Sequence, residues 1–247
     1  MIRNRRYGPG VHPHARLELK QRLWRSAVIW GTIALGVVGS VVGIVTFSHR
    51  SSAKEQMSLA LSKALPSDWR RGAGNAKVLL IEYGDYQCAP CAAYNLMIER
   101  VIAEYGSRIT FVYRHFPLRR IHRYADLAAR AAEAAGRQGR YWEMHTLLYQ
   151  RQREWANAQT ALAVFESYAR LLGLDQARFA ADLKDTVLVS KVESDYQTGL
   201  HAEVDGTPTF YVQGKKTTIA PSYPQLRRLL EEALRHAGDA MADSKAP

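Results

Sequence analysis

The sequence predicts an α/β protein in which helices flank a mixed sheet, with an all-helical segment inserted between the two halves of the sheet. The expected elements run strand, helix, strand, then helices alone, then two strands and a helix. A separate uncharged and mostly apolar run, residues 26–47, precedes them. As a helix this run is long enough to span the roughly 30 Å of a bilayer core, so one transmembrane helix is expected before the folded domain.

The N-terminal region is expected to anchor the chain in the cytoplasmic (inner) membrane. Residues 1–25 form a basic arm broken by glycine and proline. The 26–47 run is too long for a signal sequence and no Ala-x-Ala site follows it, so an anchor is favoured over a cleaved signal peptide. Seven Lys/Arg precede the run, whereas Arg50 and Lys54 follow it closely. The positive-inside rule then places the N-terminus in the cytoplasm and the chain from His49 onward in the periplasm or another extracytoplasmic space, where disulfides persist.

The basic charge of the chain is concentrated near its N-terminus. The formal net charge is +11, and residues 1–50 hold eight Lys/Arg against one Asp/Glu. The remainder is close to balanced, so we expect no nucleic-acid partner for the folded part.

Residues 48–74 are expected to form a stalk and linker, 75–236 the folded domain and 237–247 a frayed tail. Apolar or β-branched runs predict strands at 77–83, 109–113, 209–212 and 216–219, the last two joined by a hairpin at Gln213-Gly214-Lys215. Helices are predicted at 92–105, at 223–236 and through an insertion at about 119–204, within which the helical runs are 122–135, 141–151, 161–172, 176–184 and 187–204.

The two cysteines of the chain, Cys88 and Cys91, form a C-x-x-C pair between the first predicted strand and helix. At a helix N-terminus, the free N–H groups and the helix dipole stabilise a thiolate. A purely structural disulfide at this spacing would close a very small loop and would restrict the unfolded chain little. The pattern therefore indicates a redox-active pair.

Three further segments lie in order along the chain: Gly84-Asp85-Tyr86-Gln87-Cys88, Arg114-His115-Phe116-Pro117-Leu118 and Gly206-Thr207-Pro208-Thr209-Phe210. Together with the C-x-x-C pair, they make residues 75–236 resemble the thioredoxin superfamily, and within it the DsbA-like thiol–disulfide oxidoreductases that carry a helical insertion. The resemblance implies a thioredoxin-like sheet and protein dithiol or disulfide substrates. It also implies a membrane partner that recycles the enzyme, and a redox-active disulfide between the two cysteines in place of any cofactor.

The resemblance assigns roles to individual residues. Cys88 would be the exposed nucleophile, and Cys91 the shielded thiol that closes the disulfide. Glu82, at the end of an apolar strand, matches a buried acid that moves a proton to or from Cys91, aided by a raised pKa; a solvent-facing carboxylate is the alternative. Thr207 and Pro208 would form a cis peptide bond facing the cysteines.

Two further groups of residues are expected outside the chemistry. Four histidines show no H-x(3–5)-H spacing, so no metal is expected and packing or surface roles are favoured: His115, His122, His145 and His201. A basic cluster follows the second strand and is expected to be a solvated face, with docking of acidic partners as the alternative: Arg114, Arg119, Arg120 and Arg123.

The sequence thus predicts a membrane-anchored, extracytoplasmic enzyme that oxidises dithiols of secreted or envelope proteins through a mixed disulfide at Cys88. Ala89-Pro90 between the cysteines departs from the resemblance, because strongly oxidising relatives often carry histidine there and thioredoxin-like reductants carry Gly-Pro. A reductase or isomerase kept reduced by a membrane electron donor is therefore the first alternative. A non-catalytic chaperone on a thioredoxin scaffold is the second. The direction of electron flow, the substrates and the oligomeric state stay open.

Overall fold

The computed structural model of the chain describes residues 61–74, 76–218 and 222–243, together with 24, 30–32, 35, 36, 38–40 and 42–46. The chain divides into two compact units, Met1–Glu55 and Gln56–Pro247. All of the predicted arm except Trp24, part of the predicted 26–47 span and the start of the stalk lie outside the described residues. Among the residues that are described, no helix is long and apolar enough to cross a membrane.

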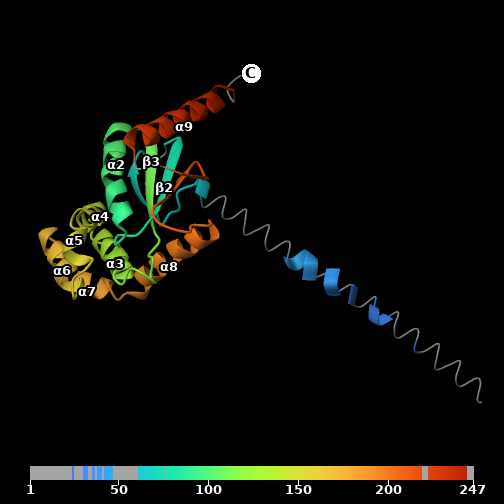
Figure 1. Cartoon of the computed structure of the whole chain (residues 1–247), viewed down its shortest axis with the longest axis horizontal. Helices are drawn as coiled ribbons and strands as arrows, with labels where there is room; N and C mark the ends of the chain where they lie inside the picture. The colour runs from blue at the N-terminus through green and yellow to red at the C-terminus, as the bar shows by residue number, and fades with distance from the viewer. Residues whose placement is uncertain are drawn as a thin grey trace, which may run out of the picture. The chain divides into compact units, whose positions relative to one another are not determined.

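A five-stranded sheet forms the centre of the larger unit, in the order β1-β3-β2-β4-β5 (Figure 1). β2 (Val78–Gly84) and β3 (Ile109–His115) are parallel neighbours. The other three strands pair antiparallel: β1 (Trp69–Gly72) with β3, β4 (Thr209–Val212) with β2, and β5 (Lys215–Thr217) with β4. β2 and β3 are buried along their whole length, which explains their apolar runs. The predicted mixed sheet is confirmed.

The edge strand β1 corrects the expectation of a stalk and linker over 48–74. Its sequence, Trp-Arg-Arg-Gly, has no apolar run, and its residues alternate between half-buried and exposed. Trp69 joins the strand to the rest of the domain, because its ring stacks on that of Tyr141 with a centroid separation of 4.5 Å. A short edge strand tolerates charged side chains, so hydrophobic patterning does not reveal it.

Helices cover the sheet. One core joins α2 (Ala89–Tyr105) and α9 (Tyr223–Asp243) to residues such as Val78 and Leu80 of β2. The opposite face packs Leu79 and Ile81 against the segment that follows α8. α9 continues through residues 237–243, which were expected to belong to the tail.

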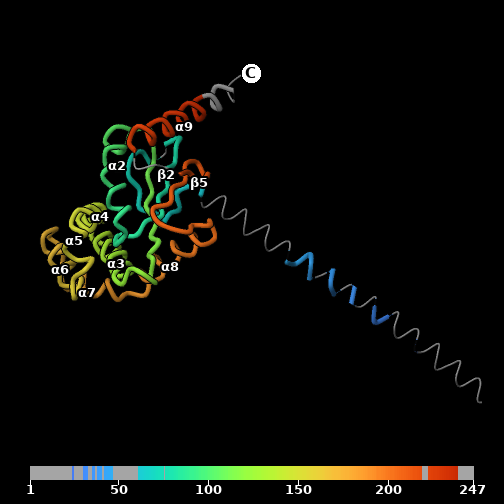
Figure 2. The backbone as a smooth tube through the Cα atoms, viewed as in Figure 1, coloured from blue at the N-terminus to red at the C-terminus, as the bar shows by residue number. Residues whose placement is uncertain are grey.

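The helices between β3 and β4 gather at the end of the unit away from α9 (Figure 2). They are α3 (Ala125–Gly136), α4 (Tyr141–Gln150), α5 (Gln152–Trp155), α6 (Leu162–Leu171), α7 (Gln176–Asp182) and α8 (Thr186–His201). The insertion therefore lies beside the N-terminal end of α2, where the cysteines are.

Candidate active site

The cysteine pair lies at the turn from β2 into α2. Cys88 is the N-cap residue of α2, and its N–H donates to the Asp85 carbonyl at 3.1 Å. Pro90 falls in the first helical turn, where a proline lacks no needed hydrogen bond. The sulfur of Cys88 is thus next to unpaired first-turn N–H groups and the positive end of the helix dipole.

The two thiols are unbonded and lie in different surroundings. Cys91 is fully buried, and this burial, together with a hydrogen bond to Cys88, raises the pKa of Cys91 well above its ordinary value. For Cys88, hydrogen bonds from the Cys91 side chain, from Thr207 and from the Cys91 backbone outweigh burial and lower the pKa to about 6. At neutral pH Cys88 is therefore mostly a thiolate while Cys91 keeps its proton.

The wall opposite the cysteines is the Thr207–Pro208 peptide bond, which is cis. The Cys88 Sγ lies 3.3 Å from the Thr207 carbonyl oxygen, to which the thiol donates. The Thr207 hydroxyl is buried and has no hydrogen-bond partner within the described part of the chain, apart from the thiolate whose pKa it helps to lower. Cys88 was expected to be exposed, but it is only 5% exposed, because this loop lies against its sulfur.

Glu82 occupies the central strand β2 and is buried, at 2% exposed. Strand alternation places it on the same face as Leu80, whose core cluster also contains Cys91. Its Oε1 has no hydrogen-bond partner among the described residues. Burial first, and then the charge of Cys88, raises the pKa of Glu82 to about 8. The carboxyl is therefore protonated at neutral pH, and the solvent-facing alternative is excluded.

Asp85 and His122 form a polar pair beside the cysteines, a role that the sequence assigned to neither residue. The buried carboxylate of Asp85 accepts hydrogen bonds from the Gln87 and Leu118 N–H groups, at 2.7 and 2.8 Å, and lies 2.7 Å from His122 Nδ1. Its charge opposes the hydrogen bonds that lower the pKa of Cys88. The position of Asp85 before the cysteine could have drawn attention to it, whereas His122 lies 37 residues further on and has no local signal.

The helical insertion reaches the active site through Gln152 on α5. Its Nε2 donates to the carbonyls of Tyr86 and Cys88, at 2.7 and 2.9 Å. These carbonyls belong to the turn that carries the nucleophile, so the insertion holds that turn in place. No pattern around Gln152 in the sequence indicates this contact.

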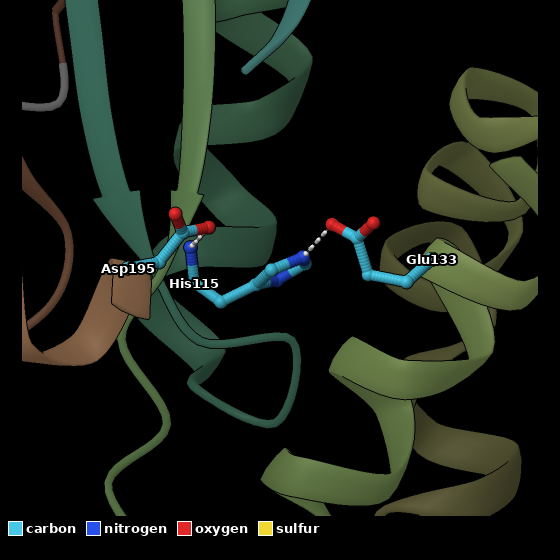
Figure 3. Close-up of side chains that lie close together, drawn as sticks. All are labelled: His115, Glu133 and Asp195. Atoms are coloured by element: carbon cyan, nitrogen blue, oxygen red, sulfur yellow. Dashed lines mark hydrogen bonds and ion pairs between the residues drawn. The ribbon is translucent and has the colours of Figure 1, made fainter. Parts of the chain in front are cut away.

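Figure 3 shows a second buried cluster, in which His115 at the end of β3 meets Glu133 from α3 and Asp195 from α8. His115 Nε2 lies 2.9 Å from Glu133 Oε1, and the His115 N–H donates to Asp195 at 3.2 Å. Lys191 also places its ammonium 2.5 Å from Asp195. The three side chains are close enough to share a metal ion, but an ammonium on Asp195 competes directly with a cation. The cluster therefore acts as an internal link between the sheet and the insertion.

Arg114 departs from the expectation that the basic cluster is a solvated face, whereas Arg119, Arg120 and Arg123 are exposed as expected. The Arg114 side chain is fully buried in an ion pair with Asp68, 2.8 Å apart, and it donates to the Tyr83 hydroxyl at 3.1 Å. Arg119 is exposed and pairs with Asp126 and with a second acidic side chain from α8. The local charge pattern alone could not separate the structural Arg114 from its exposed neighbours.

Comparisons with known proteins agree with this arrangement. A sequence profile described as Thioredoxin matches residues 64–232. In fold, the chain is similar to a thioredoxin-like oxidoreductase from Silicibacter pomeroyi (23% identity, TM-score 0.60, covering 69% of this chain and 94% of that one). It is also similar to the thiol-disulfide exchange protein α-DsbA2 from Wolbachia pipientis (20% identity, TM-score 0.60, covering 76% and 95%).

Curated relatives carry a different name. The chain is 38% identical over 149 residues to the Na(+)/H(+) antiporter NhaA 1 of Salinispora arenicola, a match that covers 60% of this chain and 22% of that protein. The chain spans about a fifth to a third of the length of the curated antiporter relatives that it matches. With its sheet order, its C-x-x-C pair at the start of α2 and its matching profile over 64–232, the chain belongs to the thioredoxin family.

Proposed function

We propose that the chain is a thiol–disulfide oxidoreductase that exchanges disulfides with protein dithiols through Cys88. The observation that carries the proposal is the contrast between the two thiols: the pKa of Cys88 is lowered to about 6, whereas that of buried Cys91 is raised. A thiolate is the attacking species in thiol–disulfide exchange, and a low pKa also makes it a good leaving group. The antiporter activity in the names of the curated relatives is not proposed for this chain, because the match covers only 22% of the first of them.

In the oxidising direction, a substrate thiolate attacks Cys88 Sγ of the Cys88–Cys91 disulfide. A new bond forms between the substrate sulfur and Cys88, and Cys91 leaves with the electron pair. Glu82, protonated at neutral pH, supplies the proton that the leaving Cys91 thiolate takes up. The second thiolate of the substrate then attacks the substrate sulfur of this mixed disulfide and releases Cys88 as a thiolate. The substrate loses two electrons and two protons; one proton restores Glu82 and the other goes to the solvent. The enzyme keeps both electrons as the Cys88 thiolate and the Cys91 thiol.

The low pKa of Cys88 favours the oxidising direction, because stabilising the reduced form raises the reduction potential. Ala89-Pro90 supplies no charged group, so the stabilisation comes from Cys91, Thr207 and the helix N-terminus. A potential near about −120 mV would support an oxidant, and one near about −270 mV would support the reductase or isomerase alternative. Equilibration of the full chain with glutathione or dithiothreitol redox buffers measures it.

We further propose that residues 26–47 anchor the chain in the cytoplasmic membrane and that the thioredoxin-like unit works on its extracytoplasmic side. The uncharged run and the bases before it support this arrangement. A membrane redox partner would then recycle the cysteines. In intact cells first treated with a reductant that does not cross the cytoplasmic membrane, a thiol reagent that is also excluded by this membrane should label Cys88; labelling only after lysis would contradict the topology.

The activity itself is tested with the full chain purified in detergent. The oxidised protein should introduce a disulfide into a reduced test protein, and Cys88→Ala should not. A Cys91→Ser variant should accumulate the mixed disulfide on Cys88 and so capture natural substrates. Equal rates for wild type and Cys88→Ala would refute the proposal. Full complementation of a deletion strain by a chain lacking both cysteines would favour the chaperone alternative.

A further inference from the structure

A groove of about 550 Å³ opens beside the active site, between the first two turns of α2 and the segment 149–154 of the helical insertion. Its edge begins at Ala89, the residue after the nucleophile. Gln152 lines this groove and also holds the carbonyl of Cys88 at 2.9 Å. The groove and the catalytic turn are therefore parts of one fixed surface.

The two walls of the groove differ in chemistry. The α2 wall is mostly apolar. It is formed by small alanines, by the buried Asn95 and by Leu96, which is 66% exposed although it is a large aliphatic side chain. The opposite wall carries Arg151 and Arg153 together with one acid, Glu154, all three exposed. An exposed leucine facing arginines beside a reactive sulfur is typical of a surface that contacts another molecule.

Two arginines against one glutamate leave this wall with a net positive charge. The Arg153 side chain makes no hydrogen bond or ion pair with any described residue. Arg151 approaches Glu154 at 4.0 Å, but the same carboxylate oxygen already accepts a hydrogen bond from Tyr168. The wall thus offers positive charge to a bound group, and a negatively charged one would complement it.

We propose that this groove binds the stretch of substrate polypeptide that flanks the cysteine reacting with Cys88, and that it selects stretches combining an apolar with an acidic side chain. The proposal rests on the proposed exchange activity. Leu96 lies about 12 Å along α2 from Cys88, a distance that about four extended residues cover. An apolar side chain about four residues from the substrate cysteine reaches Leu96, and an acidic neighbour on the other side of the strand faces Arg153.

The test uses the full chain with Cys91→Ser, so that Cys88 is its single thiol. Its substrates are two synthetic peptides, each carrying one cysteine as a mixed disulfide with thionitrobenzoate. The peptides share a leucine four residues from the cysteine and differ in having glutamate or lysine next to it. Attack of the Cys88 thiolate on the peptide sulfur forms the protein–peptide disulfide and releases coloured thionitrobenzoate, whose absorbance gives the rate.

We expect the glutamate peptide to react about threefold faster than the lysine peptide at low ionic strength, and the preference to shrink in about 0.5 M salt. Arg153→Glu should reverse the preference. Arg228→Glu is the matched control. Arg228 is also exposed, but it lies on α9, away from the groove: α9 contacts the far end of α2, where the Tyr105 hydroxyl donates a hydrogen bond to Glu231. This control should keep the wild-type preference.

Equal rates for the two peptides, or a preference that Arg153→Glu leaves unchanged, would overturn the proposal. The neutral reagent dithiodipyridine, measured on the same variants, separates this outcome from failure of the proposed function. If dithiodipyridine reacts rapidly while the peptides are not distinguished, Cys88 is a reactive thiolate and the groove is not a binding site. If Cys88 reacts with dithiodipyridine no faster than an ordinary thiol does, the proposed function fails.

Discussion

Replacing Glu82 by glutamine should make the protein more stable than wild type, by a margin that grows as the pH rises. The variant should also exchange disulfides more slowly. The substitution keeps the size of the side chain but removes its titration. In the folded protein, burial and then the charge of Cys88 raise the pKa of Glu82 from 4.5 to about 8. The unfolded chain therefore ionises this carboxyl at a lower pH than the native state does, and each pH unit between these values favours unfolding by about 1.4 kcal/mol.

The sign and size of the effect follow from the two pKa values. Below pH 4.5 the carboxyl is protonated in both states and costs nothing. Between pH 5 and pH 8 the native state keeps a proton that the unfolded state has lost, so wild type loses about 3 to 4 kcal/mol relative to Glu82→Gln. Cys88 acts in the opposite sense, because its native pKa is lowered from 9.0 to about 6 and its thiolate stabilises the reduced fold as the pH rises from 6 to 9.

The measurement is urea unfolding of wild type and Glu82→Gln from pH 5 to pH 8.5, in the oxidised form, where neither sulfur titrates. The difference between the two free energies of unfolding should grow with pH and level off below pH 8, because without the Cys88 thiolate only burial raises the pKa of Glu82. Leucine at the same position should give the same pH dependence. A difference that stays constant across this range would refute the buried, neutral carboxyl, and unchanged exchange rates would remove its role in proton transfer.

Two further predictions concern the pKa of Cys88, read from the pH dependence of thiolate absorbance or alkylation, which should show a midpoint of about 6 in wild type. Thr207→Val keeps the shape of the side chain but removes the hydroxyl that stabilises the thiolate, so the midpoint should rise; no movement would mean that the hydroxyl does not contribute. His122→Gln removes the imidazole that faces the Asp85 carboxylate and should also raise the midpoint. The control is His201→Gln, on the exposed end of α8, which should leave the midpoint unchanged. Equal responses of the two histidine variants would contradict the pairing of His122 with Asp85.

Strong local patterns account for what the sequence predicted well. The apolar runs of β2 and β3 predict buried strands because both faces of a central parallel pair are covered. Gln213-Gly214 predicts the hairpin turn, and both residues have positive φ, 50° and 79°, as a two-residue turn requires. β1 escaped prediction because an edge strand is stabilised by pairing with β3 and by Trp69, neither of which depends on local periodicity.

By itself, the sequence determined the element order, the reactive cysteine pair at a helix start and the residues that resemble the family's active site. These are local properties, set by side-chain periodicity and by the geometry of a helix N-terminus. The resemblance already implied that Glu82 and Thr207 lie near the cysteines, whereas only the tertiary structure brought His122 and Gln152 there from the insertion. Burial in the assembled core, rather than neighbouring sequence, raises the pKa of Glu82, and contacts between distant segments set the charge around Cys88. Electrostatics of this kind depends on distance in space, so it becomes readable only once the chain is folded.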